Sequence, residues 1–259
     1  MSQRETSSRS LILPRSLVLL RHGQSTTNAA GTFTGWVDVD LSDVGREEAR
    51  SAARLLRSAG LQPDVIHTSM LRRTIHTAQL VADELDRAWL PVRRSWRLNE
   101  RQYGALTGRN KTQVRIEAGA PQYQRWRRSF DTAPPPMAAA DLDKFRHDPR
   151  YAGVPADAFP VAESLADIMN RAVPYWFDAL IPDLVNGTVL VVAHGNSIRA
   201  LVAHLDKVPP QETAALNIPT GMPLCYEFDD CWVPRHPGGR YLDPEAARAA
   251  AQAIAMEGQ

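Results

Sequence analysis

The stretch Leu17–Ser25 reads LVLLRHGQS, and it decides how the chain around it is interpreted. Its first four residues are apolar without alternation, a pattern typical of a short strand buried on both faces of a parallel sheet. The strand signal ends at Arg21 and His22, and the glycine that follows permits a tight turn and close backbone approach by a ligand. Because open α/β sheets bind ligands at the carboxyl ends of their strands, we expect both side chains at a ligand-binding edge.

A second copy of this pattern lies far downstream, where Val189–Ser197 reads VLVVAHGNS. If the two apolar runs are neighbouring strands of one parallel sheet, His22 and His194 emerge at the same edge and can face each other. A lone His-Gly dipeptide is usually an ordinary turn, so it is the repetition that favours a catalytic pair of histidines.

The composition is that of an ordinary globular chain without a strong global charge. Apolar residues make up 44% of the 259 residues, and 30 Lys and Arg stand against 29 Asp and Glu. No global field attracts nucleic acid or a membrane surface, so a charged ligand must be bound by a local cluster. The two cysteines lack the neighbours of a zinc site, and so low a number favours a reducing, cytoplasmic location.

The domain organisation is expected to be simple. Residues 1–15 are rich in Ser and Arg, and Pro14 breaks the apolar stretch there, which excludes a signal peptide or membrane span and favours a flexible N-terminal extension. We expect residues 16–259 to form a single catalytic domain, with an insertion over about 109–162 and a C-terminal tail over about 237–259.

Short apolar runs alternate along the chain with longer segments of helical period. Strands are predicted over residues 17–20, 63–68, 223–228 and from Val189 onward, and helices over Ser42 to Gly60, Ser69 to Leu85, residues 163–180 with a kink at Pro174, and from Ser197 and Pro244 onward. This alternation predicts an α/β fold, a three-layer sandwich whose mostly parallel central sheet is flanked by helices on both faces.

Arg73 stands out on the helix that follows the second strand. At about 100° per residue it points away from the apolar stripe that begins at Leu71, and it lies at the same sheet edge as His22. An exposed arginine is the ordinary alternative, but this location favours a contact with phosphate. His67 and His76 have no such placement and are interpreted as structural.

A carboxylate and a basic segment follow the loop that starts at Leu98 and reads LNERQYGALTGRNK. Glu100 lies there among arginines, where a salt-bridge partner and a proton donor and acceptor are both open interpretations. From Arg109 to Arg128, six Lys and Arg accompany a single acid. The long connection up to Glu163 contains only short helical pieces, which favours a basic lid that binds a small polyanion.

Two histidines and two arginines at one sheet edge describe a phosphate pocket, because the guanidinium fork matches phosphate oxygens. A histidine in such a pocket can donate a hydrogen bond or act as the nucleophile. The sequence contains neither an acidic cluster for Mg²⁺ nor a GxxxxGK[ST] loop. We therefore expect phosphoryl transfer through a phosphohistidine without a metal ion.

Over about residues 17–243, nearly its whole length, the chain resembles the cofactor-dependent phosphoglycerate mutases of the histidine phosphatase superfamily. The resemblance is carried by LVLLRHGQS, FTGWVDVDLS, HTSMLRRTIHTA, LNERQYGALTGRNK, QRWRRSF, HDPRY, VAHGNSIRALV and NIPTG. RHG alone marks only the superfamily, whereas the LNERxYGAL, WRR and FTGW segments are typical of the mutase branch. Gln24 stands where many members have Glu, and Ala162 where a Thr is common.

This resemblance implies roles for individual residues. His22 would be the phosphorylated nucleophile and Glu100 the proton donor and acceptor, while Arg21, Arg73 and His194 would hold the transferring phosphoryl group. The implied substrate contacts are Ser25, Asn28, Thr34, Gly35, Tyr103, Lys111, Arg127, Arg128, Gly195 and Asn196.

The activity that the resemblance implies is the interconversion of 3-phosphoglycerate and 2-phosphoglycerate by a homo-oligomer, a dimer or tetramer, without nucleic-acid or membrane partners. 2,3-Bisphosphoglycerate would prime His22, and no metal would take part. One alternative is a phosphatase, or a bisphosphoglycerate synthase and phosphatase, on the same scaffold. Another is a catalytically idle protein that senses phosphorylated ligands, against which the intact set of candidate catalytic residues argues.

Overall fold

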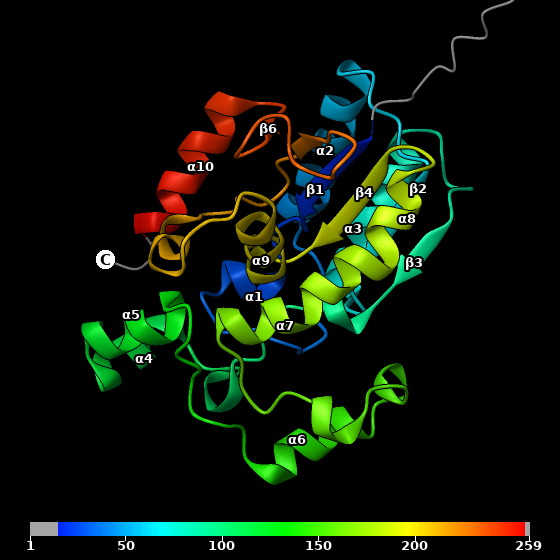
Figure 1. Ribbon diagram of the computed structural model, residues 1–259. Coiled ribbons are helices and arrows are strands. Elements are labelled where there is room, and N and C mark those ends of the chain that lie inside the picture. The colour runs from blue at the N-terminus through cyan, green and yellow to red at the C-terminus, as the bar shows by residue number, and fades with distance from the viewer. Residues whose placement is uncertain (1–14, 257–259) are drawn as a thin grey trace, which may run out of the picture.

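One mixed sheet organises the fold in the computed structural model, which describes residues 15–256 (Figure 1). The expected N-terminal extension, residues 1–15, lies outside the described residues except for Arg15. Within the described range the strands form a single sheet in the order β3-β2-β4-β1-β5-β6. Their bounds are β1 Ser16–Arg21, β2 Val65–Thr68, β3 Val92–Arg94, β4 Val189–Ala193, β5 Leu224–Glu227 and β6 Arg240–Tyr241.

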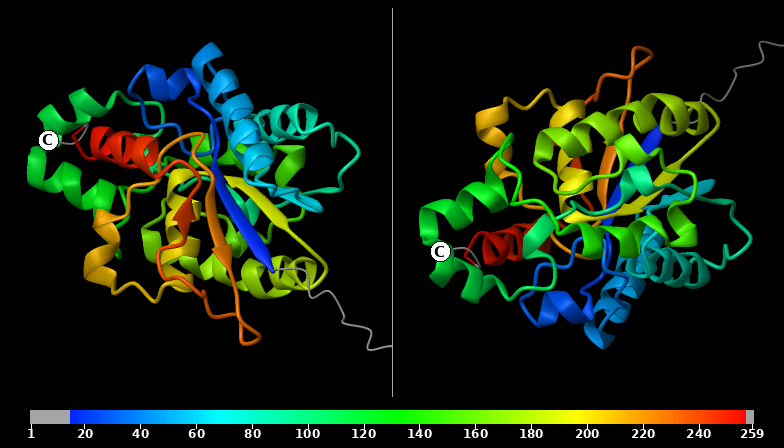
Figure 2. Two further views of the ribbon diagram at one scale, coloured as in Figure 1. Left: turned by 90° about the horizontal axis from the view of Figure 1, so that it is seen from above. Right: turned by 90° about the horizontal axis from the view of Figure 1, so that it is seen from below.

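Helices cover both faces of the sheet and its carboxyl edge (Figures 1 and 2). Their bounds are α1 Thr26–Ala29, α2 Asp43–Ser58, α3 Arg72–Glu84, α4 Lys111–Ala118, α5 Ala120–Arg128, α6 Ala139–Arg146, α7 Leu165–Tyr175, α8 Ile181–Leu184, α9 Gly195–Leu205 and α10 Pro244–Met256. The predicted α/β sandwich with a mostly parallel sheet is thereby confirmed.

The two repeated apolar runs are neighbours at the centre of the sheet. Strands β1 and β4 pair in parallel from Leu17 opposite Val189 to Arg21 opposite Ala193. Both runs therefore end at the same edge, as the repeated His-Gly pattern predicts. On its other side β1 pairs with β5 in antiparallel orientation, which makes the sheet mixed.

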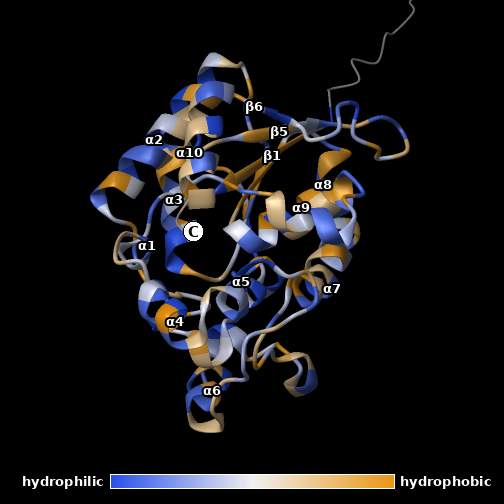
Figure 3. Ribbon diagram, turned by 90° about the vertical axis from the view of Figure 1, so that its left-hand side faces the viewer, coloured by the Kyte–Doolittle hydropathy of each residue, from blue (hydrophilic) through white to orange (hydrophobic). Residues whose placement is uncertain are grey.

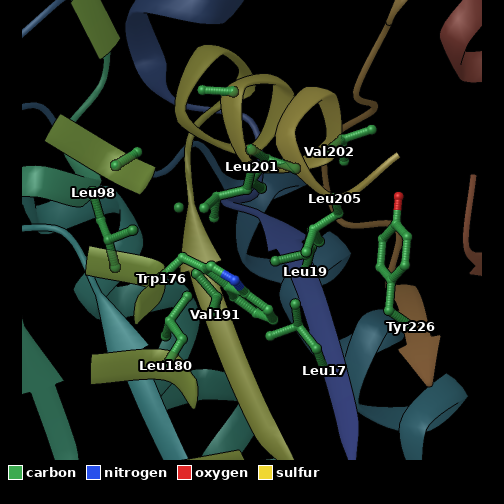
Figure 4. Close-up of a cluster of buried hydrophobic side chains, with 14 of the residues drawn as sticks. Leu17, Leu19, Leu98, Trp176, Leu180, Val191, Leu201, Val202, Leu205 and Tyr226 are labelled. Carbon is green, nitrogen blue, oxygen red and sulfur yellow. The ribbon is translucent and has the colours of Figure 1, made fainter. Parts of the chain in front are cut away.

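Alternate residues of β1 supply the two halves of the core. Leu17 and Leu19 pack toward α7 and α9, in the cluster that Figure 4 shows around Val191. Val18 and Leu20 face the opposite side, where α2 and α3 pack. Because helices pack on both sides of β1, both of its faces must be apolar. Each buried aliphatic side chain contributes about 1.5–3 kcal/mol to the free energy of folding. Hydrophobic colouring accordingly follows the central strands in Figure 3.

Two strands were absent from the sequence-based prediction. All three residues of β3 are exposed, so this edge strand carries no apolar run that could announce it. Strand β6 has only two residues, which is too short for any periodic signal. Both lie at the ends of the sheet, away from the pair that carries the histidines.

The starts of three helices differ from the prediction. Helix α3 begins at Arg72, and Ser69 does not cap it: the Ser69 hydroxyl lies 2.8 Å from Nε2 of His194 instead. Helix α7 begins after Ser164, which caps it. Helix α9 begins at Gly195, directly after the second histidine, rather than at Ser197.

Pro174 lies inside α7, one residue before that helix ends, and the kink expected there stays a prediction. The residues Trp176–Leu180 form a π-helical turn between α7 and α8.

The segment over residues 109–162 lies beyond the carboxyl edge of the sheet, where α4, α5 and α6 form a separate tier (Figure 1). It packs through two small apolar clusters, one around Trp36 and Tyr151 and one around Phe33 and Tyr123. It consists of short helices, as predicted, and its closing as a lid stays a prediction. No helix in the described range has the length and apolar character needed to cross a membrane.

We predict that Gly45→Ala destabilises the fold at the first histidine corner. A Cβ at Gly45 would lie 2.0 Å from the backbone oxygen of Gln24. The overlap should cost about 1–3 kcal/mol, more than the roughly 1 kcal/mol that alanine gains in helix propensity. Urea unfolding should show a lower midpoint than wild type.

The control is Gly153→Ala, where an added Cβ meets nothing within 4 Å. A Gly45→Ala midpoint no lower than that of Gly153→Ala would show that α2 shifts freely and that the close approach is not a constraint.

Candidate active site

The two His-Gly corners open into one cavity of about 250 Å³. Its wall combines the strand edge, the basic segment and the C-terminal helix α10. The lining residues are Arg21, His22, Gln24, Asn28, Thr32, Phe33, Thr34, Gly35, Arg73, Glu100, Tyr103, Lys111, Arg127, Arg128, Gly195, Asn196, Arg199, Thr220, Ala250, Ala253 and Ile254. Of the predicted site residues, Ser25 and His194 are absent from this wall.

His22 is held in one tautomer by two contacts. Its Nδ1 lies 2.6 Å from the backbone oxygen of Gly23, so Nδ1 must carry the proton. Arg73 donates from Nε to His22 Nε2 over 3.3 Å, so Nε2 presents a lone pair. Burial, followed by the positive charges of Arg73 and Arg21, holds the pKa of His22 well below its ordinary value. A neutral imidazole with an unprotonated Nε2 is what a nucleophile requires.

His194 lies behind His22 and is completely buried. The two ring centroids are 4.9 Å apart in an edge-on arrangement. Nε2 of His194 is 2.8 Å from the Ser69 hydroxyl, whereas its buried Nδ1 has no hydrogen-bond partner within residues 15–256. Burial and the nearby Arg73 hold its pKa well below the ordinary value. An orphaned buried ring nitrogen beside the nucleophile fits a group that contacts a transferred phosphoryl oxygen.

Arg73 is fixed by the loop opposite it. Its Nη1 and Nη2 donate to the backbone oxygens of Val37 and Gly35 over 2.9 and 2.8 Å. Burial lowers its pKa to about 10, which leaves it charged at neutral pH. The sequence placed Arg73 at this edge correctly, although its side chain is only 1% exposed.

Arg21 is a second fixed positive charge near His22. It donates from Nη1 to the backbone oxygen of Ile218 over 2.7 Å. Its buried Nε has no hydrogen-bond partner among the described residues. Arg21 and Arg73 thus place two fixed positive charges near the histidine, which suits a phosphate group.

Glu100 is oriented by hydrogen bonds. Its Oε1 accepts from Asn196 Nδ2 over 2.9 Å and from the Arg101 backbone nitrogen over 2.7 Å. Two of its basic neighbours are engaged elsewhere, since Arg97 faces Asp178 and Arg109 pairs with Glu117. The carboxylate itself lines the cavity. This geometry favours the proton donor and acceptor over the simple ion-pair partner.

A buried ion pair holds the backbone on which Glu100 lies. Glu163 and Arg171 pair over 2.6 Å, with side chains 3% and 6% exposed. Arg171 also donates to the backbone oxygen of Glu100 over 3.0 Å, and Trp36 donates to the same oxygen over 2.6 Å. Glu163 accepts from the Gln102 backbone nitrogen. The backbone at Glu100 is therefore positioned by Trp36, Glu163 and Arg171, which lie outside the cavity wall.

The basic segment brings three of its cations to the cavity: Lys111, Arg127 and Arg128. Arg127 stacks over the Tyr123 ring at 5.3 Å, and its buried Nη1 has no hydrogen-bond partner within residues 15–256. Tyr103 accepts from Asn196 Nδ2 over 3.1 Å. Lys111, Arg127 and Arg128 add three cations to the same cavity and can hold a second anionic group.

Ser25 has a structural role in the corner. Its hydroxyl accepts from the Asn28 backbone nitrogen over 3.1 Å, and the Ser25 backbone nitrogen donates to Asn28 Oδ1 over 3.2 Å, forming a capping box. Ser25 is fully buried below the wall that Asn28 lines. It positions α1 and reaches the cavity only through that helix.

Sequence reasoning missed two parts of the wall. Arg199 lies one helical turn after Asn196, a spacing that puts both on one face of α9. Ala250, Ala253 and Ile254 of α10 also line the cavity, and their i, i+3, i+4 spacing is the signal of a packed helix face. Within the described residues no group of three or more His, Cys, Asp or Glu could hold a metal ion.

Residues 17–147 and 137–231 match a family model described as "Histidine phosphatase superfamily (branch 1)". The chain belongs to the histidine phosphatase superfamily. The two matched segments contain both His-Gly corners, Arg73 and Glu100, the groups that form the catalytic edge.

Curated relatives in this superfamily align over nearly their whole length. A 2,3-bisphosphoglycerate-dependent phosphoglycerate mutase from Thermobifida fusca is 57% identical over 94% of this chain and 99% of the relative. Proteins of the same name from Streptomyces avermitilis and Cutibacterium acnes are 54% and 56% identical, covering 95% and 93% of this chain and 98% of each relative.

Solved structures of the superfamily share the fold at lower identity. A mycobacterial glucosyl-3-phosphoglycerate phosphatase in complex with VO₃ has a TM-score of 0.61 and 30% identity, covering 82% of this chain and 92% of that chain. A putative alpha-ribazole-5'-P phosphatase from Escherichia coli has a TM-score of 0.65 at 23% identity over 88% of this chain and 95% of that chain, which supports the fold alone.

Proposed function

We propose that this chain is a 2,3-bisphosphoglycerate-dependent phosphoglycerate mutase that interconverts 3-phosphoglycerate and 2-phosphoglycerate. The observation that carries the proposal is a neutral His22 whose unprotonated Nε2 accepts from Arg73, in a cavity that Arg21, Lys111, Arg127 and Arg128 also line. The 57% identity to a mutase over nearly the whole chain supports it. A cytoplasmic location and a homo-oligomer stay predictions, as does the single domain over residues 16–259.

The residues present fit a ligand with two phosphate groups. Buried nitrogens without partners within residues 15–256 occur on two arginines of the cavity wall, Arg21 Nε and Arg127 Nη1. Buried donors of this kind are costly unless a ligand satisfies them. 2,3-Bisphosphoglycerate supplies the phosphoryl group that primes His22.

In the first half-reaction, phosphorylated His22 transfers its phosphoryl group to the 2-hydroxyl of 3-phosphoglycerate. The N–P bond at Nε2 breaks as the O–P bond forms, and Glu100 takes the hydroxyl proton. Arg21, Arg73 and His194 stabilise the charge on the transferring oxygens. These fixed donors do the work that metal ions do in kinases, so we propose catalysis without a metal.

In the second half-reaction the bisphosphorylated molecule turns end for end within the cavity. His22 then takes the phosphoryl group from the 3-oxygen, and Glu100 returns its proton to that oxygen, which leaves 2-phosphoglycerate. Meanwhile Lys111, Arg127 and Arg128 hold the phosphate that is not reacting. This retention distinguishes a mutase from a phosphatase, in which water accepts the phosphoryl group.

The proposed function predicts mutase turnover primed by 2,3-bisphosphoglycerate and indifferent to chelators. The assay couples 2-phosphoglycerate formation to enolase, whose required Mg²⁺ is added only after the mutase is quenched. EDTA should leave the mutase rate unchanged. His22→Ala should abolish turnover and also the phosphorylation of the protein by 2,3-bisphosphoglycerate, because the nucleophile is gone. Loss of activity in EDTA that Mn²⁺ or Mg²⁺ restores would contradict the metal-free mechanism. Phosphate release without 2-phosphoglycerate would identify a phosphatase.

Glu100→Gln tests the proton donor and acceptor. The amide keeps the shape and the hydrogen bonds of the carboxylate but cannot take a proton, so turnover should fall by about 10²–10⁴-fold. The thermal midpoint serves as the control and should stay near that of wild type. A turnover number within about threefold of wild type would assign Glu100 to positioning instead.

The double variant Arg127→Ala with Arg128→Ala tests retention of the intermediate. Each charge-assisted contact contributes about 1.5–3 kcal/mol, so its loss should let the bisphosphorylated molecule escape and expose phosphorylated His22 to water. The ratio of 2-phosphoglycerate formation to phosphate release should fall about tenfold or more. The control is Arg125→Ala, on the same helix but outside the cavity wall. An unchanged ratio with both rates lowered would mean that the two arginines serve binding or folding alone.

A further inference from the structure

Arg199 belongs to the cavity but has no role in the scheme above. It lies on α9, and its side chain is only 8% exposed. Nε donates to the backbone oxygen of Leu216 over 2.9 Å, and Nη1 donates to Asn196 Oδ1 over 3.1 Å. Two of its nitrogens are thus bound by oxygens of the protein itself rather than directed at a ligand.

The Asn196 amide links this guanidinium to the reactive carboxylate. Its Oδ1 accepts from Arg199, while its Nδ2 donates to Glu100 Oε1 over 2.9 Å and to the Tyr103 hydroxyl over 3.1 Å. An amide turned by 180° would place its oxygen against the Glu100 carboxylate and its NH₂ group against the guanidinium. Both contacts would be repulsive, so the positive charge of Arg199 selects the orientation observed.

We propose that Arg199 is a positioning residue, which fixes the Asn196 amide so that the amide holds the Glu100 carboxylate in place for proton transfer. This inference rests on the proposed function, in which Glu100 takes and returns the proton. With Oε1 held by Asn196 and by the Arg101 backbone nitrogen, Oε2 is the oxygen that exchanges the proton with substrate.

A buried arginine in these surroundings needs a reason for its presence. Burial, with the nearby positive charges of Arg128 and Arg101, lowers the pKa of Arg199 to about 9. It therefore stays charged at neutral pH at an electrostatic cost, since like charges repel in a poorly solvated site. An apolar residue would fill the same space without that cost, but it would leave the Asn196 oxygen without its donor.

A double-mutant cycle separates this role from a structural one. Arg199→Met in the wild-type background should lower kcat about tenfold and leave KM for 3-phosphoglycerate nearly unchanged, since coupled neighbours commonly show effects of this size. In the Glu100→Gln background the same substitution should change kcat by less than about twofold, because the group that it positions no longer transfers a proton. Arg199→Lys, which keeps a charged donor, should recover most of the loss.

Equal losses of kcat in both backgrounds would overturn the proposal and make Arg199 structural. A large rise in KM with kcat unchanged would overturn it in favour of a substrate contact. The control is Arg87→Met, which removes a partly buried arginine that pairs with Asp64 and lies outside the cavity wall. That variant should leave kcat and KM unchanged.

A measurement that needs no turnover tests the amide directly. The side-chain amide protons of Asn196, assigned by their loss in Asn196→Asp, should exchange slowly with solvent in the NMR spectrum of the wild type and faster in Arg199→Met. Unchanged exchange would overturn the proposal whatever the activity. A wild type without mutase activity would instead refute the proposed function, so the two failures are distinguishable.

Discussion

The parallel pairing of β1 with β4 is the constraint on which the rest of the structure depends. It places Arg21 opposite Ala193, so both strands end at the same level of the sheet. The next residue after each strand is a histidine, His22 or His194. The rings of His22 and His194 consequently approach to 4.9 Å. Burial of both faces of the two strands fixes this register, since a slip of one residue would exchange the two halves of the core. Core packing and the geometry of the histidine pair are therefore one requirement.

The site concentrates positive charge and keeps its histidines neutral, and these two properties support each other. Burial and the charges of Arg73 and Arg21 lower the pKa of His22, while its contact with the Gly23 oxygen places the remaining proton on Nδ1. Nε2 is then unprotonated beside the Arg73 guanidinium, in a cavity whose arginines attract phosphate. The same positive field that favours a phosphate group thus prevents protonation of the atom that must attack it.

The sequence predicts the paired strands and Arg73, but it does not predict the role of Arg199, the contact of Ser69 or strand β3. Paired His-Gly corners predicted which strands are neighbours, and helical phase placed Arg73 at the correct edge, because both depend on short-range periodicity. Arg199 could not be recognised, since its role depends on how Asn196 meets Glu100 across 96 positions in the chain. The sequence does not show that the Ser69 hydroxyl faces His194, so the helix predicted from Ser69 begins only at Arg72 in the structure. Strand β3 is exposed and therefore lacks an apolar pattern.

The central claim is that Nε2 of His22 carries the phosphoryl group. The most direct test is phosphorus NMR of the intact protein after reaction with 2,3-bisphosphoglycerate, using ¹⁵N-labelled histidine so that coupling identifies the bonded nitrogen. The account predicts a single phosphohistidine at Nε2 of His22, because Nδ1 is held by the Gly23 oxygen. A phosphoryl group on Nδ1, on His194 or on a carboxylate would contradict it.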